Sequence, residues 1–370
     1  MHVNNKLYKF LLHITNFAQV ILLVGIFLNL LHKRLYKNKK GSVMKMKNTG
    51  LSLLSVDAGK ESTKYIIKNE FGIERGIFKT KVQKTYNFGV DIEKNSFLVD
   101  YNNQQYVVGE MVKDSKSSYD LSKKSIEHKI CIYIAAAKAM KKTGNNRFKI
   151  VIGAPLTTYK NLKAKNEYRE YILDNGHINI NINGEKFDFY IDDVLVLPEC
   201  IGPVFNQMEE FRKIRLNIVD IGGLNVNLCR FHKMVPEVGS MLVANKGANI
   251  LKAKIADKLS EIFGIIIYKD DVEQILEDGM LYINGKPKEE SKTLIRNIME
   301  QHLEDIIRFA KQNELDIFSS NGKVVFTGGG SLLLKEVIQS MYPNAQIATD
   351  AQFSNALAFY KVLSIKNEQA

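Results

Sequence analysis

The chain has 370 residues, 45% of them hydrophobic and 25% charged, so its length suits two domains with sizeable cores. This composition excludes a disordered chain, a collagen-like repeat and a small disulfide scaffold. The formal charge is +12, but residues 1–48 contain eight lysines, one arginine and no Asp or Glu. The rest of the chain is nearly balanced in charge, so we expect no direct binding of nucleic acid by it.

The N-terminal extension, residues 1–48, has two interpretations. Phe10–Leu31 is almost wholly apolar, is long enough to cross a bilayer and precedes a run of basic residues. It could therefore be a membrane anchor or amphipathic tail whose basic flank stays in the cytoplasm. Alternatively, the native protein starts at Met44 or Met46, just before the first predicted strand. We predict this second case, a soluble cytoplasmic protein, with membrane contact only if residues 1–48 are translated.

The first half of the main body begins with a hairpin. Leu51–Lys68 reads as strand, turn and strand, with the turn at Ala58–Thr63. Thr80–Val108 is rich in β-forming residues and in Asn, Gly and Asp, which predicts a small antiparallel patch. The pattern then predicts a helix over Ile126–Lys142 and a short buried strand over Lys149–Gly153.

The second half repeats this design. Leu216–Phe231 again reads as strand, turn and strand, and in both hairpins the first strand ends in Asp-x-Gly. So distant a duplication suggests two similarly built domains that face each other. Apolar spacing and glycine turns predict the elements that follow: helix Ile250–Phe263, helix Ser291–Gln312, strand Lys323–Phe326, turn Thr327–Ser331 and helix Leu332–Met341. Strands alternate with helices, so the predicted class is α/β.

The turns after the duplicated strands carry the groups that a nucleoside triphosphate needs. Such a ligand requires close backbone amides, a cation and a carboxylate for its Mg²⁺. In the first hairpin Gly59 permits a tight turn and Asp57 supplies the carboxylate, while Lys60 or Lys64 supplies positive charge. Asp220 matches Asp57 in the second hairpin.

Glycines complete this set. Gly222 and Gly223 leave room for the backbone to approach the other side of the phosphates, and a third glycine turn, Gly328–Gly330, opens a helix. The chain contains no Gly-x-x-x-x-Gly-Lys-Ser/Thr sequence, which excludes a Walker-type site. Each turn alone would most often be structural, but the three together favour a nucleotide cleft.

The order of these segments resembles the five-part ATPase signature of the actin, heat-shock chaperone and sugar kinase superfamily. The segments are, in chain order, Asp57–Lys64, Leu197–Pro203, Asp220–Gly223, Thr327–Gly330 and Ser354–Ala356. Gly153–Tyr159 and the short length look like the ParM/StbA group of bacterial actin-like proteins.

The resemblance implies an actin-like (ribonuclease H-like) two-domain fold with the nucleotide cleft between duplicated domains. Domain I would span residues 49–215 and be completed by residues 346–370. Domain II would span residues 216–345. The implied ligand is ATP, with GTP as an alternative, together with Mg²⁺.

The resemblance also implies roles for single residues. Asp57 and Asp220 would flank a hydrated Mg²⁺, contacting it through water. Lys64 would contact the β- and γ-phosphates, and Glu199 would position or polarise the attacking water. Glu199 and Asp220 are therefore the candidate catalytic residues. Further candidate contacts with the nucleotide are Gly59, Lys60, Gly222, Gly223, Asn225, Gly328, Gly329 and Gly330, of which Gly328 and Gly329 would pass under the adenosine.

The chain departs from the ParM-like pattern in the second hairpin. Leu224 and Asn225 follow the paired glycines, where such proteins often have hydroxyl residues, and Asn227 replaces a frequent Asp. Elsewhere, we expect Asn355 and Ala356 to pack and form hinge contacts without chemistry of their own.

Two further features have structural interpretations. Cys131, Cys200 and Cys229 lie in apolar stretches without metal-ligand spacing, so we expect buried, reduced thiols and no zinc site. The apolar segment Phe263–Tyr268 is either an exposed surface for self-association or a buried strand.

The leading hypothesis is a filament-forming, Mg²⁺-dependent ATPase that segregates plasmid DNA. Its partners would be other copies of the chain and, through an adaptor protein, DNA. One alternative is a small-molecule kinase of the same fold, although Gly153–Lys165 contains no carboxylate to act as a base. Another is a membrane-tethered cytoskeletal scaffold, which requires translation of residues 1–48.

Overall fold

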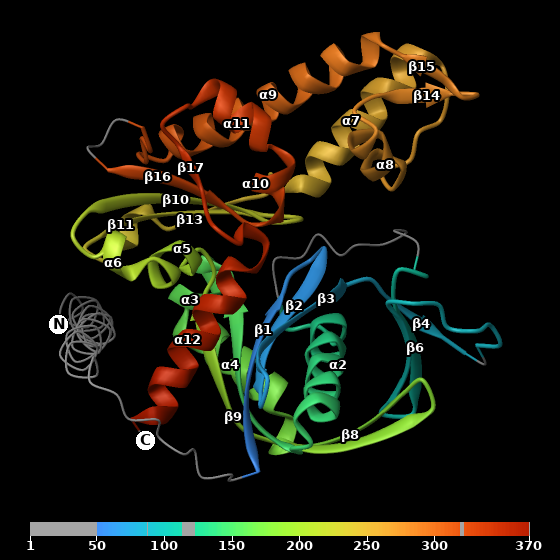
Figure 1. The fold of residues 1–370 in the computed structure, drawn as a ribbon, viewed down its shortest axis with the longest axis vertical. Helices are drawn as coiled ribbons and strands as arrows, with labels where there is room; N and C mark the ends of the chain where they lie inside the picture. The colour runs from blue at the N-terminus through green and yellow to red at the C-terminus, as the bar shows by residue number, and fades with distance from the viewer. Residues whose placement is uncertain (1–49, 87, 113–122, 319–321, 370) are drawn as a thin grey trace, which may run out of the picture.

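The computed structural model of the protein describes residues 50–86, 88–112, 123–318 and 322–369 (Figure 1). The predicted membrane segment Phe10–Leu31 and the candidate starts Met44 and Met46 lie outside these residues. Within them, no helix combines the length and the apolar character that crossing a membrane requires.

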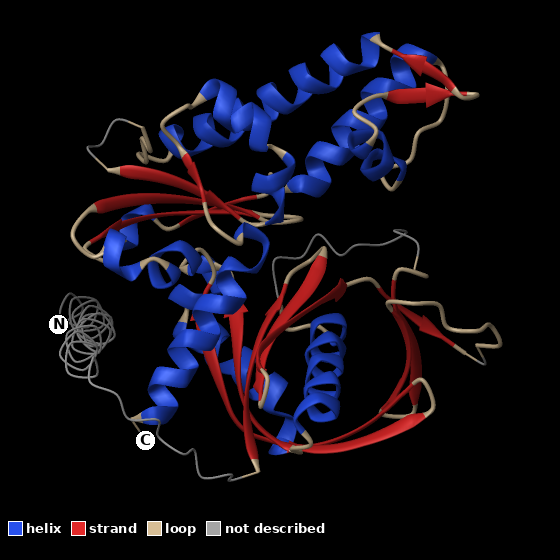
Figure 2. Cartoon of the chain, viewed as in Figure 1, coloured by secondary structure: helices blue, strands red, loops and turns tan. Residues whose placement is uncertain are grey.

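The first sheet wraps around a helix. It contains nine strands, namely β1 (Leu51–Ala58), β2 (Ser62–Asn69), β3 (Gly72–Lys79), β4 (Val82–Thr85), β5 (Ser96–Tyr101), β6 (Gln104–Gly109), β7 (Arg147–Ala154), β8 (His177–Ile182) and β9 (Glu185–Pro198). Their order across the sheet is β3-β2-β1-β7-β9-β8-β5-β6-β4. Figure 2 shows the sheet curving around α2 (Ile126–Thr143), which explains why α2 is buried on most of its surface.

Local signals fix the ends of α2. The Ser125 side chain caps its first turn by accepting a hydrogen bond from the backbone N–H of His128, and Gly144 ends it in the left-handed region at φ 71°. Lys141 and Lys142 lie in the last turn, where positive charge interacts favourably with the helix dipole. The helix predicted over Ile126–Lys142 is confirmed.

The second sheet repeats the arrangement at the centre of the first. It contains six strands, namely β10 (Arg215–Ile221), β11 (Val226–His232), β12 (Val235–Pro236), β13 (Leu242–Ala244), β16 (Lys323–Thr327) and β17 (Gln346–Ile347). In both sheets the first strand pairs antiparallel with the next and parallel with a later one: β1 with β2 and β7, and β10 with β11 and β16. The predicted duplication of the hairpin is therefore confirmed.

The remaining elements cover the two sheets. The helices near the first sheet are α3 (Leu156–Lys160), α4 (Leu162–Leu173) and α12 (Ser354–Glu368), while α5 (Gly202–Asn206) and α6 (Met208–Phe211) lie beside the second sheet (Figure 1). Those of the second half are α7 (Ala248–Phe263), α8 (Asp271–Glu277), α9 (Glu290–Gln312), α10 (Gly329–Leu333) and α11 (Lys335–Met341). A two-stranded ribbon, β14 (Leu281–Ile283) with β15 (Lys286–Lys288), lies between α8 and α9.

The C-terminal helix returns to the first half of the chain. α12 packs against β1, β2 and β7, so the chain's last helix lies beside its first strand (Figure 1). β17, however, pairs with β16, so the second sheet extends just past the predicted boundary at residue 345. The division into domains I and II remains a prediction, and its boundaries lie within two residues of the ends of the second sheet.

One expectation about secondary structure needs correction, and one of two open alternatives is excluded. The helix predicted over Leu332–Met341 is two short helices, α10 and α11, because the backbone leaves helical geometry at Leu334 (φ −91°, ψ 11°). The apolar segment Phe263–Tyr268 is not a buried strand. Gly264 ends α7 in the left-handed region, after which Ile266 and Tyr268 are mostly exposed while Ile267 is buried.

Candidate functional site

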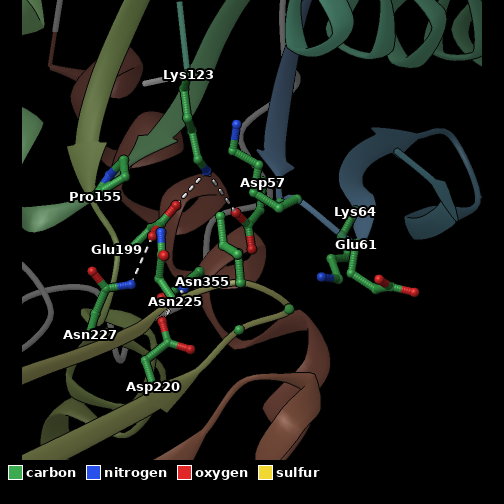
Figure 3. A pocket seen from close by; sticks show the side chains of 15 residues that line it. Asp57, Glu61, Lys64, Lys123, Pro155, Glu199, Asp220, Asn225, Asn227 and Asn355 are labelled. Carbon is green, nitrogen blue, oxygen red and sulfur yellow. Dashed lines mark hydrogen bonds and ion pairs between the residues drawn. The ribbon is translucent and has the colours of Figure 1, made fainter. Parts of the chain in front are cut away.

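A pocket lies between the duplicated hairpins, where both turns face each other (Figure 3). Nine of the candidate site residues line it, and its full lining is Asp57, Gly59, Lys60, Glu61, Lys64, Lys123, Pro155, Glu199, Asp220, Gly222, Gly223, Leu224, Asn225, Asn227 and Asn355. The first hairpin supplies one wall and the second hairpin the opposite wall. The structure therefore brings together residues that lie far apart in the sequence.

The strand register explains how the two hairpins differ. Asp57 on β1 lies opposite Lys64 on β2, and Asp220 on β10 lies opposite Asn227 on β11. Each hairpin thus offers a carboxylate at the same place, but only the first pairs it with a cation. The second hairpin presents a neutral amide at that place.

Glu199 enters from the end of β9 and is held from two sides. Lys123 forms an ion pair with its Oε1 atom, and Asn227 Nδ2 donates a hydrogen bond to its Oε2 atom at 2.9 Å. The following residue, Cys200, has a φ of 73°, a costly conformation for a residue that is not glycine. This turn also points the backbone N–H of Cys200 at Asp220 Oδ2, 3.2 Å away.

Asp220 receives a second hydrogen bond, from Asn355 Nδ2 at 2.8 Å. Asn355 in turn accepts from the backbone N–H of Gly202 at 3.2 Å. The expectation that Asn355 serves only packing and hinge contacts is therefore wrong, because α12 delivers its amide directly to the candidate catalytic carboxylate. Ala356 does act structurally, since its carbonyl accepts a hydrogen bond from Ser55 Oγ at 2.7 Å.

Burial and mutual repulsion shape the electrostatics of the pocket. Burial raises the pKa of Asp57, although Lys123 and Lys64 oppose this shift. Burial and the negative charge of Glu199 together raise the pKa of Asp220 to about 7. For Lys123, burial opposes the charged form, but Glu199 and Asp57 outweigh it and raise the pKa above its ordinary value. Asp57, Glu199 and Asp220 thus share one region of a pocket that is also lined by Lys60, Lys64 and Lys123.

Two of the glycines lie so close to neighbouring atoms of the site that a larger residue would not fit there. Gly328 has a φ of 84°, and a Cβ there would lie 2.4 Å from the Ile221 carbonyl oxygen and 2.5 Å from Asp220 Oδ1. A Cβ at Gly223 would lie 2.6 Å from Cβ of Glu61, across the pocket. Gly328–Gly330 do not line the pocket itself. Gly328 immediately precedes α10, and Gly329 and Gly330 form its first turn.

Sequence reasoning missed Lys123 and Glu61. Lys123 is only 4% exposed and lies between Glu199 and Asp57, with its Nζ atom 3.9 Å from Asp57 Oδ1. No motif marks it, and the sequence shows only a lysine just ahead of a predicted helix.

Glu61 joins ion pairs that connect the two halves of the chain. Lys79 on β3 lies 2.9 Å from Glu61 and 3.1 Å from Glu273 on α8, and Lys252 on α7 lies 2.6 Å from Glu273. Burial alone would raise the pKa of Glu61, but Lys79 and Lys252 outweigh it and lower the pKa to about 2. The cluster links the turn after β1 to the helices of the second half.

The donor set suits a hard divalent cation. Asp57, Glu199 and Asp220 present carboxylate oxygens, and Asn225 and Asn227 each have a buried side-chain oxygen without a hydrogen-bond partner. Mg²⁺ prefers oxygen ligands and usually keeps several waters. Across the described ranges, no group of three or more His, Cys, Asp or Glu side chains forms a ready-made metal site. The three cysteines are buried free thiols, as expected.

Comparisons with known proteins agree with this geometry. Residues 55–202 match the family model for the N-terminal domain of actin-like proteins. No curated protein matches the chain. The Alp12 filament structure is 30% identical, with a TM-score of 0.64, and the match covers 86% of this chain and all of Alp12.

More distant structures share the fold. An archaeal actin homolog, Ta0583, solved in complex with ADP, is 19% identical with a TM-score of 0.65, covering 85% of this chain and 99% of the homolog. A 15-stranded ParM filament from Clostridium botulinum is 17% identical with a TM-score of 0.66, again covering 85% and 99%. At these identities the likeness concerns the fold alone.

Proposed function

Because the chain belongs to the family of actin-like proteins, we propose that it is a Mg²⁺-dependent ATPase that forms filaments and segregates plasmid DNA. The observation that carries the ATPase part is the convergence of Asp57, Glu199 and Asp220 on one pocket between two glycine turns. The filament part is supported by the 30% identity to Alp12, which was solved as a filament.

The proposed roles follow from the contacts. Backbone amides of the turns at Gly59 and Gly222–Gly223 approach the phosphates, and Lys64 adds positive charge opposite Asp57. When bound, Mg²⁺ would neutralise charge on the phosphates and orient them, with Asp57 and Asp220 holding it through water. Glu199, held by Asn227 through one oxygen, orients a water for attack on the terminal phosphate.

We also propose a nucleotide preference, a mode of contact with DNA and a cellular location. We place GTP second to ATP, and we assign contact with DNA to an adaptor protein, because the described part of the chain has no marked excess of basic residues. Plasmid DNA lies in the cytoplasm, so the proposed role puts the protein there.

Assembly in the presence of nucleotide tests the proposal. Light scattering and pelleting should rise above a critical protein concentration with ATP and Mg²⁺, and stay flat with EDTA. Asp57→Ala should abolish this response, whereas Asp91→Ala, which removes an exposed carboxylate of the same half, should not. A protein that hydrolyses ATP only with a small-molecule acceptor and never sediments would instead be a kinase.

A further inference from the structure

The side chain of Lys123 reaches into the pocket and ends between Glu199 and Asp57. Its side chain is 4% exposed, its ammonium forms an ion pair with Glu199 Oε1, and the same nitrogen lies 3.9 Å from Asp57 Oδ1 (Figure 3). The two carboxylates come from different elements, the end of β1 and the residue after β9. One ammonium therefore links two strands across the pocket.

Burying a charged lysine in this way is unfavourable for folding unless other interactions offset it. Removing an ammonium from water is strongly unfavourable, and only closely placed carboxylates offset this loss. The neighbouring Lys124 shows the ordinary alternative: it is 46% exposed and pairs with Glu167 on the surface at 3.2 Å. Two adjacent lysines thus differ sharply, and only Lys123 points into the pocket.

The partners of Lys123 are those that a divalent cation would need. An ammonium and a hydrated Mg²⁺ both seek carboxylate oxygens, and mutual repulsion prevents two cations from sharing them at close range. Asp57 is assigned above to the metal, and Glu199 to the attacking water. Because the Lys123 ammonium already contacts both Asp57 and Glu199, it must affect both metal binding and the positioning of water.

We propose that Lys123 competes with Mg²⁺ for Asp57 and Glu199, so that the metal binds in the pocket only together with nucleotide phosphates. The phosphates provide new acceptors for the displaced ammonium, which removes the cost of breaking its ion pairs. Lys123 is then a positioning residue that makes metal binding depend on nucleotide. This inference rests on the proposed function, which supplies Mg²⁺ and nucleotide.

The proposal is tested by measuring Mg²⁺ binding to the protein in the absence of nucleotide. Thermal unfolding of wild type, Lys123→Met and Lys124→Met is followed as Mg²⁺ is titrated into nucleotide-free protein. Lys123→Met should start with a lower Tm, and then gain about 2–4 °C once Mg²⁺ exceeds its Kd about tenfold. Wild type and Lys124→Met should respond little. Lys123→Gln, which keeps a hydrogen-bond donor toward Glu199, should gain in the same direction even if the Met variant folds poorly.

The outcomes separate this inference from the proposed function. Equal Mg²⁺ responses of Lys123→Gln, Lys123→Met and Lys124→Met would overturn the competition. Calorimetric titration of wild type with ATP and Mg²⁺ is run beside it. If wild type binds the nucleotide while the lysine variants ignore Mg²⁺ alone, only the inference fails. If wild type binds no nucleotide, the proposed function fails.

Discussion

Asn227 Nδ2 donates to Glu199 Oε2 at 2.9 Å, and both side chains are buried. The carboxylate proposed to orient water is thus fixed from the second hairpin by an amide, while Lys123, from the first half of the chain, pairs with its other oxygen in the nucleotide-free protein. An amide at position 227 can donate this hydrogen bond, whereas the ionised Asp that ParM-like proteins often carry there could not.

Asn227→Asp should therefore slow hydrolysis. A second carboxylate beside Glu199 repels it and favours its protonation, so the water loses its orienting group. We expect single-turnover hydrolysis to fall by about 10² or more, near the lower range for loss of a positioned base. Asn227→Ala, which removes the donor without adding charge, should lose less. An Asp variant as fast as wild type would show that Glu199 does not need the amide.

Glu199→Ala should separate hydrolysis from binding. A group that orients water acts mainly on the barrier, whereas a carboxylate that holds the metal also contributes to the ground state. We expect Glu199→Ala to slow single-turnover hydrolysis by about 10² to 10⁴ with little change in nucleotide Kd. Asp57→Ala should damage both. Filaments of the Glu199 variant should also outlive those of wild type, which pelleting over time can measure; unchanged turnover would remove Glu199 from the proposed role.

The hairpins and the main helices were predictable because their signals are local. Short apolar runs bounded by turn residues define β1 and β10, and Ser125 and Gly144 mark the ends of α2. The convergence of the duplicated Asp-x-Gly turns could also be expected from the repeat. These features depend on neighbours in the sequence, so the sequence alone reveals them.

The contacts that complete the pocket depend on tertiary placement. Lys123, just ahead of α2, reads as an ordinary basic residue until the packing of α2 against the curved sheet places it between Asp57 and Glu199. Asn355 reads as helix packing until α12 folds back and directs its amide at Asp220. The parallel pairing of β9 with β7 and the approach of Lys252 to Glu61 likewise depend on partners distant in the sequence, and no local pattern encodes these pairings.

The ion pairs of Glu273 should control opening between the two halves. Glu273→Gln removes the negative charge from its contacts with Lys79 and Lys252, at 3.1 Å and 2.6 Å. Because Glu273 is half exposed, we expect a stability loss within about 1 kcal/mol. The nucleotide dissociation rate, however, should rise several-fold in stopped-flow measurements. Glu261→Gln is the matched variant, since Glu261 pairs with Lys258 inside α7; equal rates for both variants would exclude a role of Glu273 in opening.

The two neighbouring glycines Gly328 and Gly329 should respond differently to alanine. At Gly328 a methyl group would meet the Ile221 carbonyl and Asp220, and the φ of 84° disfavours any side chain. Gly328→Ala should lower the free energy of unfolding by about 2 kcal/mol or more. At Gly329 an added Cβ would meet no atom of the described residues within 4 Å, so Gly329→Ala should be nearly neutral for stability. Denaturant titration measures both, and similar losses would contradict the steric account.

Asp220 should make the nucleotide-free protein less stable as the pH rises. Its pKa is about 7 in the folded protein and near the ordinary 3.8 when unfolded, so folding favours the protonated form. The associated stability is fully present below pH 4 and is lost as the pH rises through 7. The loss is on the order of a few kcal/mol, since each pKa unit is worth about 1.4 kcal/mol.

Asp220→Asn isolates this effect from the other titrating groups. The amide oxygen can still accept from Cys200 N–H and Asn355, which both donate to one carboxylate oxygen in the wild type. The variant cannot ionise, so its free energy of unfolding relative to wild type should increase between pH 5 and pH 8. Denaturant titrations at several pH values, without nucleotide or metal, measure this difference. A constant difference would mean that Asp220 titrates near its ordinary pKa. The same variant should bind nucleotide with less dependence on Mg²⁺, because the metal in the proposed site needs the ionised carboxylate that high pH provides.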